Sequence, residues 1–143
     1  MEFKKINPKK YGELLFKMDA QAFCRSFDYP STSIKTTLDY LKNCTVYLVY
    51  KDDVPIGVFA YKKSGEEVEV KQIVVLPGFQ GKGYGTLIVK KLLELVRGSR
   101  IQLVTHPKNT AAIILYLKNG FQIREWKDNY YGDGEPRLVL QLR

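Results

Sequence analysis

A glycine-rich hexapeptide lies between two segments of different periodicity. Residues 80–85 read QGKGYG; the run before them, QIVVLP, is apolar and β-branched, and the run after them, TLIVKKLLELV, has the spacing of an amphipathic helix. Glycine has no Cβ, so successive backbone N–H groups of such a loop can turn toward one point. Because a helix N-terminus already attracts anions, that point suits a phosphate group. The alternative is a connecting turn that binds nothing.

Two familiar phosphate-binding motifs do not describe this loop. A P-loop requires a glycine, four spacer residues and then Gly-Lys-Ser/Thr, and the dinucleotide fingerprint requires GxGxxG at the start of a βαβ unit. The glycines at positions 81, 83 and 85 follow a GxGxG pattern instead. The loop therefore predicts neither a nucleoside-triphosphate site nor a dinucleotide site of the usual kind.

Length and composition predict one globular domain. The 143 residues fit a single domain, residues 1–143, and 45% hydrophobic with 27% charged residues is typical of globular proteins. No window approaches the ~18 apolar residues of a membrane span, and the N-terminal run MEFKKINPKKYGELL lacks the apolar part of a signal peptide. We therefore expect a cytoplasmic protein with no membrane contact.

Charge and cysteine content limit the kinds of molecule and metal that this chain is expected to bind. The 23 Lys and Arg residues exceed the 15 Asp and Glu residues, and a net charge of +8 favours anionic partners such as phosphates, acidic proteins or nucleic acid. The basic residues are scattered, which argues against nucleic acid. Cys24 and Cys44 lie outside any CxxC pattern and have only His106 as a companion, so we expect reduced thiols and no metal site.

The periodicity of the chain alternates between helical and extended segments. Helices are predicted at residues 9–23, 33–43, 84–98 and 109–119, and strands at 45–50, 55–63, 67–76, 100–105, 121–127 and 137–143. Ser33 is the expected N-cap of the second helix, and short turns predict antiparallel pairing of the first three strands. The order ααβββαβαββ predicts an α/β (mixed α+β) fold, in which a mixed central β-sheet is flanked by helices.

Two linked motifs resemble the GNAT superfamily of acetyl-CoA-dependent N-acetyltransferases. The first, IVVLPGFQGKGYGTLIVKKLLELV, resembles motif A of that superfamily through Gln80, Gly83 and Gly85. The second follows the pattern N-x-x-A-x-x-x-Y-x-x-x-G-F, with Asn109, Ala112, Tyr116, Gly120 and Phe121. The order of elements also matches the superfamily from about Phe3 to Leu142.

The resemblance implies that acetyl-CoA is the cofactor. Its pyrophosphate is expected on the backbone amides of the loop, namely Gln80, Gly81, Lys82, Gly83, Tyr84, Gly85 and Thr86. In the superfamily the preceding strand splays from its parallel neighbour, so backbone groups near Val74 and Val75 are expected to bind the pantetheine arm and the acetyl carbonyl. Gln72 interrupts the apolar face of this strand, as a bulge would, although a polar residue at a sheet edge is an equal alternative.

The resemblance also implies direct attack of a primary amine on the thioester, in a ternary complex. Glu69 stands where several family members carry a carboxylate that takes the amine proton; its alternative role is a solvated strand face beside Lys71. Tyr116 matches the tyrosine that protonates the departing sulfur, and its alternative is a core tyrosine. Asn109 is expected to cap its helix, to contact the pantetheine arm, or both.

The acceptor is less clearly defined by the sequence. Residues 129–136, NYYGDGEP, resemble the branch that acetylates protein N-termini and ribosomal proteins, in which tyrosines such as Tyr130 and Tyr131 line the peptide entrance. Here Pro136-Arg137 replaces that branch's Asp-Ala, so lysines and small amines stay open as acceptors. The family also places Asp28 and Tyr29 on the opposite wall.

Several alternatives remain at this stage. Tyr130 and Tyr131 can instead cover the sheet end. We expect His106 to be structural and Trp126 to lie in the core. A CoA-binding, RNA-binding or acidic-partner module without turnover is the alternative function, and both a monomer and a homodimer stay open.

Overall fold

The computed structural model describes residues 1–22 and 33–143. Its strands are β1 (Glu2–Ile6), β2 (Thr45–Lys51), β3 (Val54–Ser64), β4 (Glu67–Val75), β5 (Arg100–Thr105), β6 (Gln122–Lys127) and β7 (Arg137–Leu142). Its α-helices are α1 (Gly12–Ala22), α2 (Ile34–Tyr40), α3 (Tyr84–Leu95) and α4 (Thr110–Lys118), and two short 3-10 helices are η1 (Pro8–Lys10) and η2 (Pro77–Phe79). None of the described helices has the length and apolar character needed to cross a membrane.

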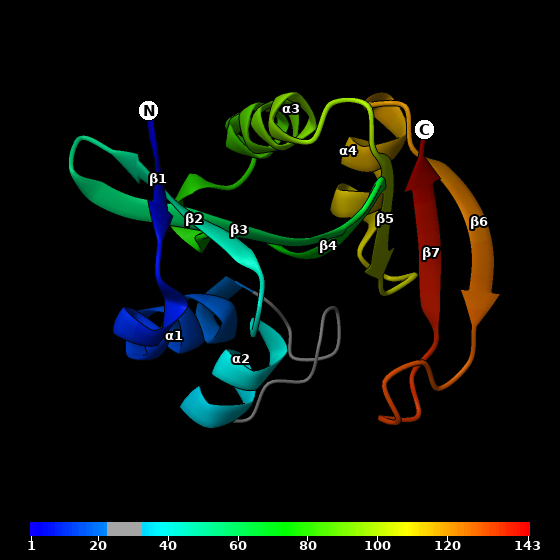
Figure 1. Cartoon of the computed structure of the whole chain (residues 1–143), viewed down its shortest axis with the longest axis horizontal. Coiled ribbons are helices and arrows are strands. Elements are labelled where there is room, and N and C mark those ends of the chain that lie inside the picture. Colours follow the sequence, from blue (N-terminus) through cyan, green and yellow to red (C-terminus); the bar gives the residue numbers. More distant parts are fainter. Residues whose placement is uncertain (23–32) are drawn as a thin grey trace.

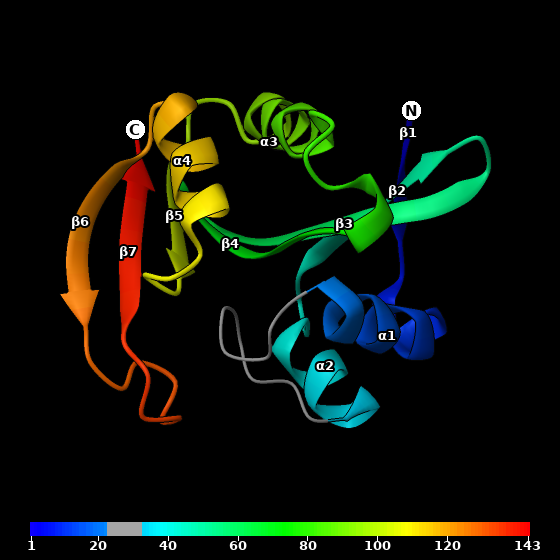
Figure 2. The same ribbon diagram turned by 180° about the vertical axis from the view of Figure 1, so that it is seen from behind.

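The strands form one mixed sheet in the order β1-β2-β3-β4-β5-β7-β6. β4 and β5 are parallel and are joined by α3, and the neighbouring pairs β3 with β4 and β5 with β7 are antiparallel. α3 and α4 lie on one side of the sheet, and α1 and α2 lie on the other (Figures 1 and 2). The predicted mixed α/β fold is confirmed.

The sequence-based element order lacks one strand. β1 pairs with β2 from Glu2 opposite Tyr50 to Ile6 opposite Val46. Only Phe3 and Ile6 are apolar in this segment, so the strand has too little periodicity to be detected from sequence. Phe3 nevertheless anchors it, because its ring packs edge-on against Phe59, with 6.1 Å between the ring centroids.

A β-bulge in β4 divides the core between the two faces of the sheet. Ala60 pairs with Gln72 and Tyr61 pairs with Val70, which leaves Lys71 as the extra residue. Val68 and Val70, before the bulge, belong to the apolar cluster that includes the buried side of α3, whereas Val74, after it, belongs to the cluster under α1. Side chains after the bulge therefore point to the opposite face from the one that regular alternation would give them.

Three predictions about single residues can be compared with the structure. Ser33 caps α2, and its hydroxyl accepts a hydrogen bond from the Thr36 N–H at 3.1 Å, as predicted. Gln72 is buried and its Nε2 donates to Asp19 Oδ1 at 3.1 Å, so the bulge interpretation of this residue is confirmed over the edge interpretation. The prediction that Trp126 lies in the core is wrong: its side chain is 57% exposed on edge strand β6.

We expect Gly57→Ala to lower the free energy of unfolding by about 1–3 kcal/mol, a typical overpacking cost. A Cβ at this position would lie 2.6 Å from the carbonyl oxygen of Val74, and backbone cannot move away cheaply. Gly78→Ala is the control, because a Cβ there meets no heavy atom within 4 Å. Chemical denaturation of both variants provides the measurement, and equal stabilities would contradict the close approach of β3 to β4.

Candidate active site

β4 and β5 separate toward their carboxyl ends. They pair only between residues 67–70 of β4 and residues 100–103 of β5, although both strands continue further. Leu76 N–H donates to Ile56 O on the β3 side at 2.9 Å. Because alternate residues of a strand point to the same neighbour, the backbone groups of Val74 face β3, and those of Ile73 and Val75 face the gap left by β5. The predicted splay is present, with Ile73 and Val75 as the residues that face it.

The glycine loop forms the N-terminal end of α3. Gly83 is the N-cap, with φ of +88°, a left-handed conformation that favours glycine. The first intrahelical bond runs from Leu87 N–H to Gly83 O at 3.3 Å, so the N–H groups of residues 83–86 have no acceptor within the helix. Together with the helix dipole, these donors form an anion-binding end.

Gln80 differs from the other loop residues. Its backbone N–H donates to Pro77 O at 3.3 Å, and its side-chain Nε2 donates to Val75 O at 2.8 Å. The Gln80 amide is therefore already used in the turn. Its side chain instead fastens the loop to the end of β4.

A cleft of about 530 Å³ lies between the separated strands and the first turns of α3 and α4. The predicted residues that line it are Val75, Gln80, Gly81, Gly83, Gly85, Thr86, Asn109 and Tyr116. Three of the predicted cofactor-binding residues do not line it. Val74 is fully buried toward α1, whereas Lys82 and Tyr84 flank the loop beside the ring of Phe79.

Tyr116 and Asn109 enter the cleft from α4. Tyr116 is only 7% exposed and its ring lies 5.8 Å from that of Phe121, so it belongs to the core and to the cleft at once. Asn109 occupies the N-cap position but its side chain makes no capping bond; its Nδ2 donates to Thr105 Oγ1 at 3.2 Å. The end of β5 thus fixes the orientation of the Asn109 amide.

Glu69 lies on the side of β4 away from α3. It is half-buried and forms an ion pair with Lys71, which lines the cleft. The hydroxyl of Tyr40 donates to Lys71 O at 3.0 Å, and the Lys71 ammonium lies 5.0 Å from the centroid of the Tyr40 ring. Glu69 therefore faces the side of the sheet opposite the helix that carries the glycine loop.

The β6–β7 loop holds the two predicted acceptor tyrosines. Tyr130 and Tyr131 are half-buried and pack edge to face, with 4.8 Å between their ring centroids. The Arg137 guanidinium carbon lies 5.1 Å from the Tyr131 centroid. Asp28 and Tyr29, predicted for the opposite wall, lie outside the described residues.

Two buried residues that shape this loop, Arg137 and His106, were not assigned a role in the predicted site. Arg137 is fully buried, and its Nη2 donates to Asp133 Oδ2 at 2.8 Å. His106 is 1% exposed; its Nδ1 accepts from Lys108 N–H at 3.0 Å, so Nε2 carries the proton toward Glu135 Oε1, also at 3.0 Å. The only signals were the departure at residues 136–137 and the lone histidine, and the expected structural role of that histidine agrees with its contacts.

The chain belongs to the Acetyltransferase (GNAT) family, whose model matches residues 15–121. N-alpha-acetyltransferase RimI of Mycobacterium tuberculosis is 38% identical to it over 65 residues, which cover 46% of this chain. The chain covers 41% of that relative, which is less than half of its length. The predicted family is confirmed.

Solved structures share the fold along the whole chain. The ribosomal-protein-S18-alanine N-acetyltransferase of Escherichia coli superposes with a TM-score of 0.83 at 19% identity, over 99% of this chain and 92% of that chain. A GNAT acetyltransferase of Elizabethkingia anophelis, solved with acetyl-CoA bound, gives 0.78 at 21% identity, over 99% and 97%. At these identities the likeness shows a common fold.

Asp133 provides a pH-dependent test of its ion pair with the buried Arg137. Burial acts to raise the pKa of Asp133, but the Glu135 N–H and the Arg137 guanidinium outweigh it and hold the pKa below its usual value. A carboxyl with a lowered pKa in the folded state stabilises the protein above its unfolded pKa, and this contribution is lost as the pH falls through the folded pKa.

We therefore expect Asp133→Asn to cost about 1–3 kcal/mol at neutral pH, because it removes the negative charge that accepts a hydrogen bond from the buried Arg137 guanidinium. The difference from the wild type should shrink on acidification below about pH 4, where the Asp133 carboxyl of the unfolded wild type begins to bind a proton. Denaturation between neutral and acidic pH measures this. Asp53→Asn, in an exposed turn, is the control; a difference that does not depend on pH would contradict the ion pair.

Proposed function

We propose that this protein transfers the acetyl group of acetyl-CoA to a primary amine, by direct attack of the amine in a ternary complex. The observation that carries the proposal is the separation of β4 from β5 directly beside the unpaired N–H groups at the start of α3. Few arrangements put an anion-binding helix end and an unpaired strand edge in one cleft. Membership of the acetyltransferase family supports the same reading.

The cleft fits acetyl-CoA in its donor chemistry. The N–H groups of residues 81–86 hold the diphosphate, because they lie at the positive end of α3 and those of residues 83–86 lack intrahelical acceptors. Ile73 and Val75 present backbone groups toward the gap, where an amide-containing arm can bind as a further strand would. The bound cofactor supplies an activated acetyl thioester.

Tyr116 is the general acid in this proposal. Its phenol would give a proton to the sulfur of coenzyme A as the nitrogen–carbon bond forms and the carbon–sulfur bond breaks. Among the α4 side chains that line the cleft, Tyr116 is the one with a proton to donate. Packing against Phe121 fixes the ring, so the hydroxyl is positioned before the reaction.

Glu69 is the general base, acting through water from the far side of β4. An α-amino group with a pKa near 8 is about one-tenth neutral at pH 7, whereas a lysine side chain with a pKa near 10.4 is neutral in roughly one molecule in 2,500. A carboxylate that removes the amine proton is therefore needed most for lysine and at low pH. Its ion pair with Lys71 holds Glu69 next to the gap between the strands.

We expect Tyr116→Phe to lower kcat by roughly 10²-fold or more, the range of general acid catalysis, with little change in the Kd for coenzyme A. The ring and its contact with Phe121 are kept, so only the phenolic proton is lost. Thiol release measures kcat and calorimetry measures binding. Unchanged turnover would remove Tyr116 from the mechanism, and binding of coenzyme A without thiol release from any amine would contradict the proposed function.

For Glu69→Gln we expect a loss of kcat that grows as the pH falls, because a smaller share of the acceptor is then neutral. The pH–rate profile of the variant is compared with that of the wild type. Glu66→Gln, at the exposed turn before β4, is the control for a lost negative charge. A profile of unchanged shape would show that Glu69 is not the base.

A further inference from the structure

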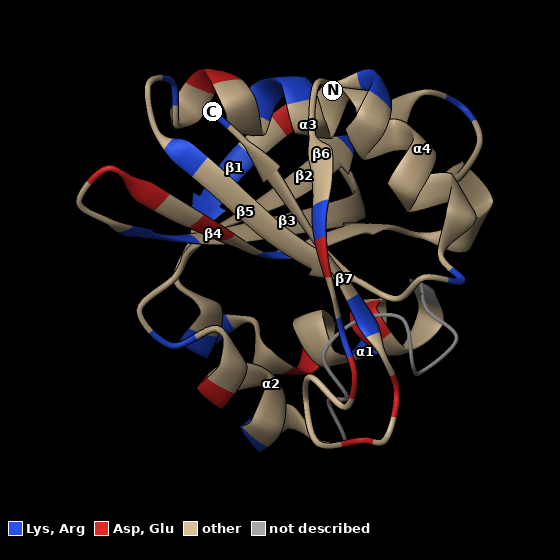
Figure 3. Cartoon of the chain, turned by 90° about the vertical axis from the view of Figure 1, so that its right-hand side faces the viewer, with Lys and Arg blue, Asp and Glu red and all other residues tan. Residues whose placement is uncertain are grey.

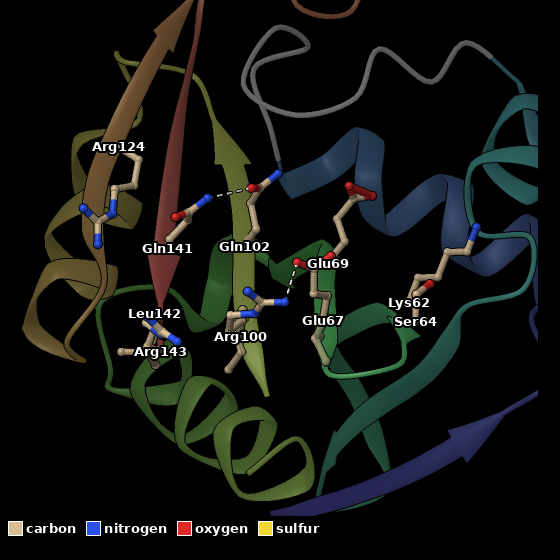
Figure 4. A pocket seen from close by; sticks show the side chains of 12 residues that line it. Lys62, Ser64, Glu67, Glu69, Arg100, Gln102, Arg124, Gln141, Leu142 and Arg143 are labelled. Atoms are coloured by element: carbon tan, nitrogen blue, oxygen red, sulfur yellow. Dashed lines mark hydrogen bonds and ion pairs between the residues drawn. The ribbon is translucent and has the colours of Figure 1, made fainter. Parts of the chain in front are cut away.

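A polar groove of about 520 Å³ lies on the sheet face that α3 and α4 leave uncovered (Figure 4). The groove crosses β4, β5 and β7, with β3 on one side and β6 on the other. Its polar side chains on β4 and β5 come from the positions that alternate with the core: Gln102, for example, lies between the buried residues Ile101 and Leu103. No described helix packs on this part of the face.

The polar side chains at the centre of the groove are paired with one another, whereas one cation on each side of the groove has no ion-pair partner among the described residues. Glu67 forms an ion pair with Arg100 at 3.0 Å, and Gln141 Nε2 donates to Gln102 Oε1 at 3.0 Å. Lys62 and Arg124, by contrast, form no ion pair with any residue of the described chain. Figure 4 shows them on opposite sides of the groove.

Arg124 is directed by a second β-bulge. Ile123 pairs with Leu140 and Glu125 pairs with Val139, which leaves Arg124 as the extra residue of β6. Its neighbours Glu125 and Lys127 form an ion pair with each other at 3.8 Å, and Figure 3 shows these basic and acidic segments of β6 next to one another. Arg124 is thus the cation of this strand that lines the groove.

The groove and the cofactor cleft adjoin each other at one ion pair. Glu69 lines the groove, Lys71 lines the cleft, and the two side chains form an ion pair where β4 leaves β5. An acceptor amine placed beside Glu69 therefore has the groove as a path for the chain that follows it.

We propose that this groove binds the acceptor as an extended polypeptide with acidic side chains a few residues after its reactive N-terminal amine. The inference rests on the proposed function and adds the acceptor class to it. Adjacent strands lie about 4.8 Å apart, so the path from β4 over β5 and β7 to β6 is about 14 Å, which is four or five extended residues. Acidic residues at about the fourth and fifth positions then reach Arg124.

The composition of the groove favours a polypeptide over a nucleic acid. Glu67 and Glu69 stand in its path and are each paired with a cation, so the centre of the groove offers no net positive charge to a chain of phosphates. None of the described residues that line it is aromatic, whereas sites for single-stranded nucleic acid use aromatic rings for base stacking. Gln102 and Gln141 instead offer amide donors and acceptors that suit a peptide backbone.

The test compares peptides that share their first three residues and carry glutamate, serine or lysine at the following positions. Thiol release gives kcat/KM, and anisotropy of the same peptides labelled at their C-termini gives Kd with coenzyme A present. We expect glutamate to exceed lysine by about fivefold to tenfold in kcat/KM, because Arg124 attracts the first side chain and repels the second, and added salt to reduce the ratio.

The variant Arg124→Glu should reverse this preference. Arg97→Glu makes the same charge change just after α3, away from the groove, and should keep the wild-type order. Thermal melts establish that both variants fold.

The outcomes separate the two proposals. Turnover with no acidic preference, or with a preference that the Arg124 variant keeps, overturns the groove assignment and leaves the acetyltransferase proposal standing. If acidic peptides bind through Arg124 without any thiol release, the groove is supported and the proposed function is contradicted. The assignment is also overturned if single-stranded RNA competes for the groove and the glutamate, serine and lysine peptides bind equally weakly.

Discussion

The backbone of β4 beyond Val70 has a strand partner on one side only, and the rest of the site follows from that. Buried N–H and C=O groups without partners cost about 1–3 kcal/mol each, so the open edge of Ile73 and Val75 must be satisfied by water, side chains or a ligand. One of these groups already has a partner within the protein, since the Gln80 side chain donates to Val75 O. What remains is an unpaired strand edge directly beside the unpaired helix end at Gly83. A ligand with an amide-bearing arm and a diphosphate satisfies both.

The bulge at Lys71 makes this separation compatible with a continuous core. In a regular strand of this sequence the side chains of Val68, Val70 and Val74 would all face one layer; because of the bulge, Val74 packs toward α1 while Ile73 and Val75 turn toward the cleft. Gln72 is buried at the same point and donates to Asp19 of α1. This one irregularity thus sets which side chains of β4 face the cleft and which pack toward α1.

The sequence predicted the parts of the site that depend on local chemistry. The glycine loop, the Ser33 cap and the position of Tyr116 follow from residue type and spacing, which act over a few residues. β1 was missed because two apolar residues, Phe3 and Ile6, give no usable period. Trp126 was misplaced because its exposure depends on β6 being the edge strand.

Other features follow only from the tertiary structure. Arg137 is buried because Asp133 and Tyr131 surround it, and a charged residue is expected in solvent until such partners are known. The polar groove likewise depends on which sheet face the helices leave uncovered. Both are properties of residues far apart in the chain, and they determine how the acceptor side differs from the cofactor side.

The most direct measurement of the central claim is the response of individual backbone amides to coenzyme A. In a two-dimensional ¹⁵N–¹H spectrum, the amides of Gly81, Gly83, Gly85 and Thr86 should shift on addition of coenzyme A and should respond far less to pantetheine, which lacks the diphosphate. If the signals of these amides do not shift, or shift equally with both compounds, a diphosphate bound at the start of α3 is contradicted.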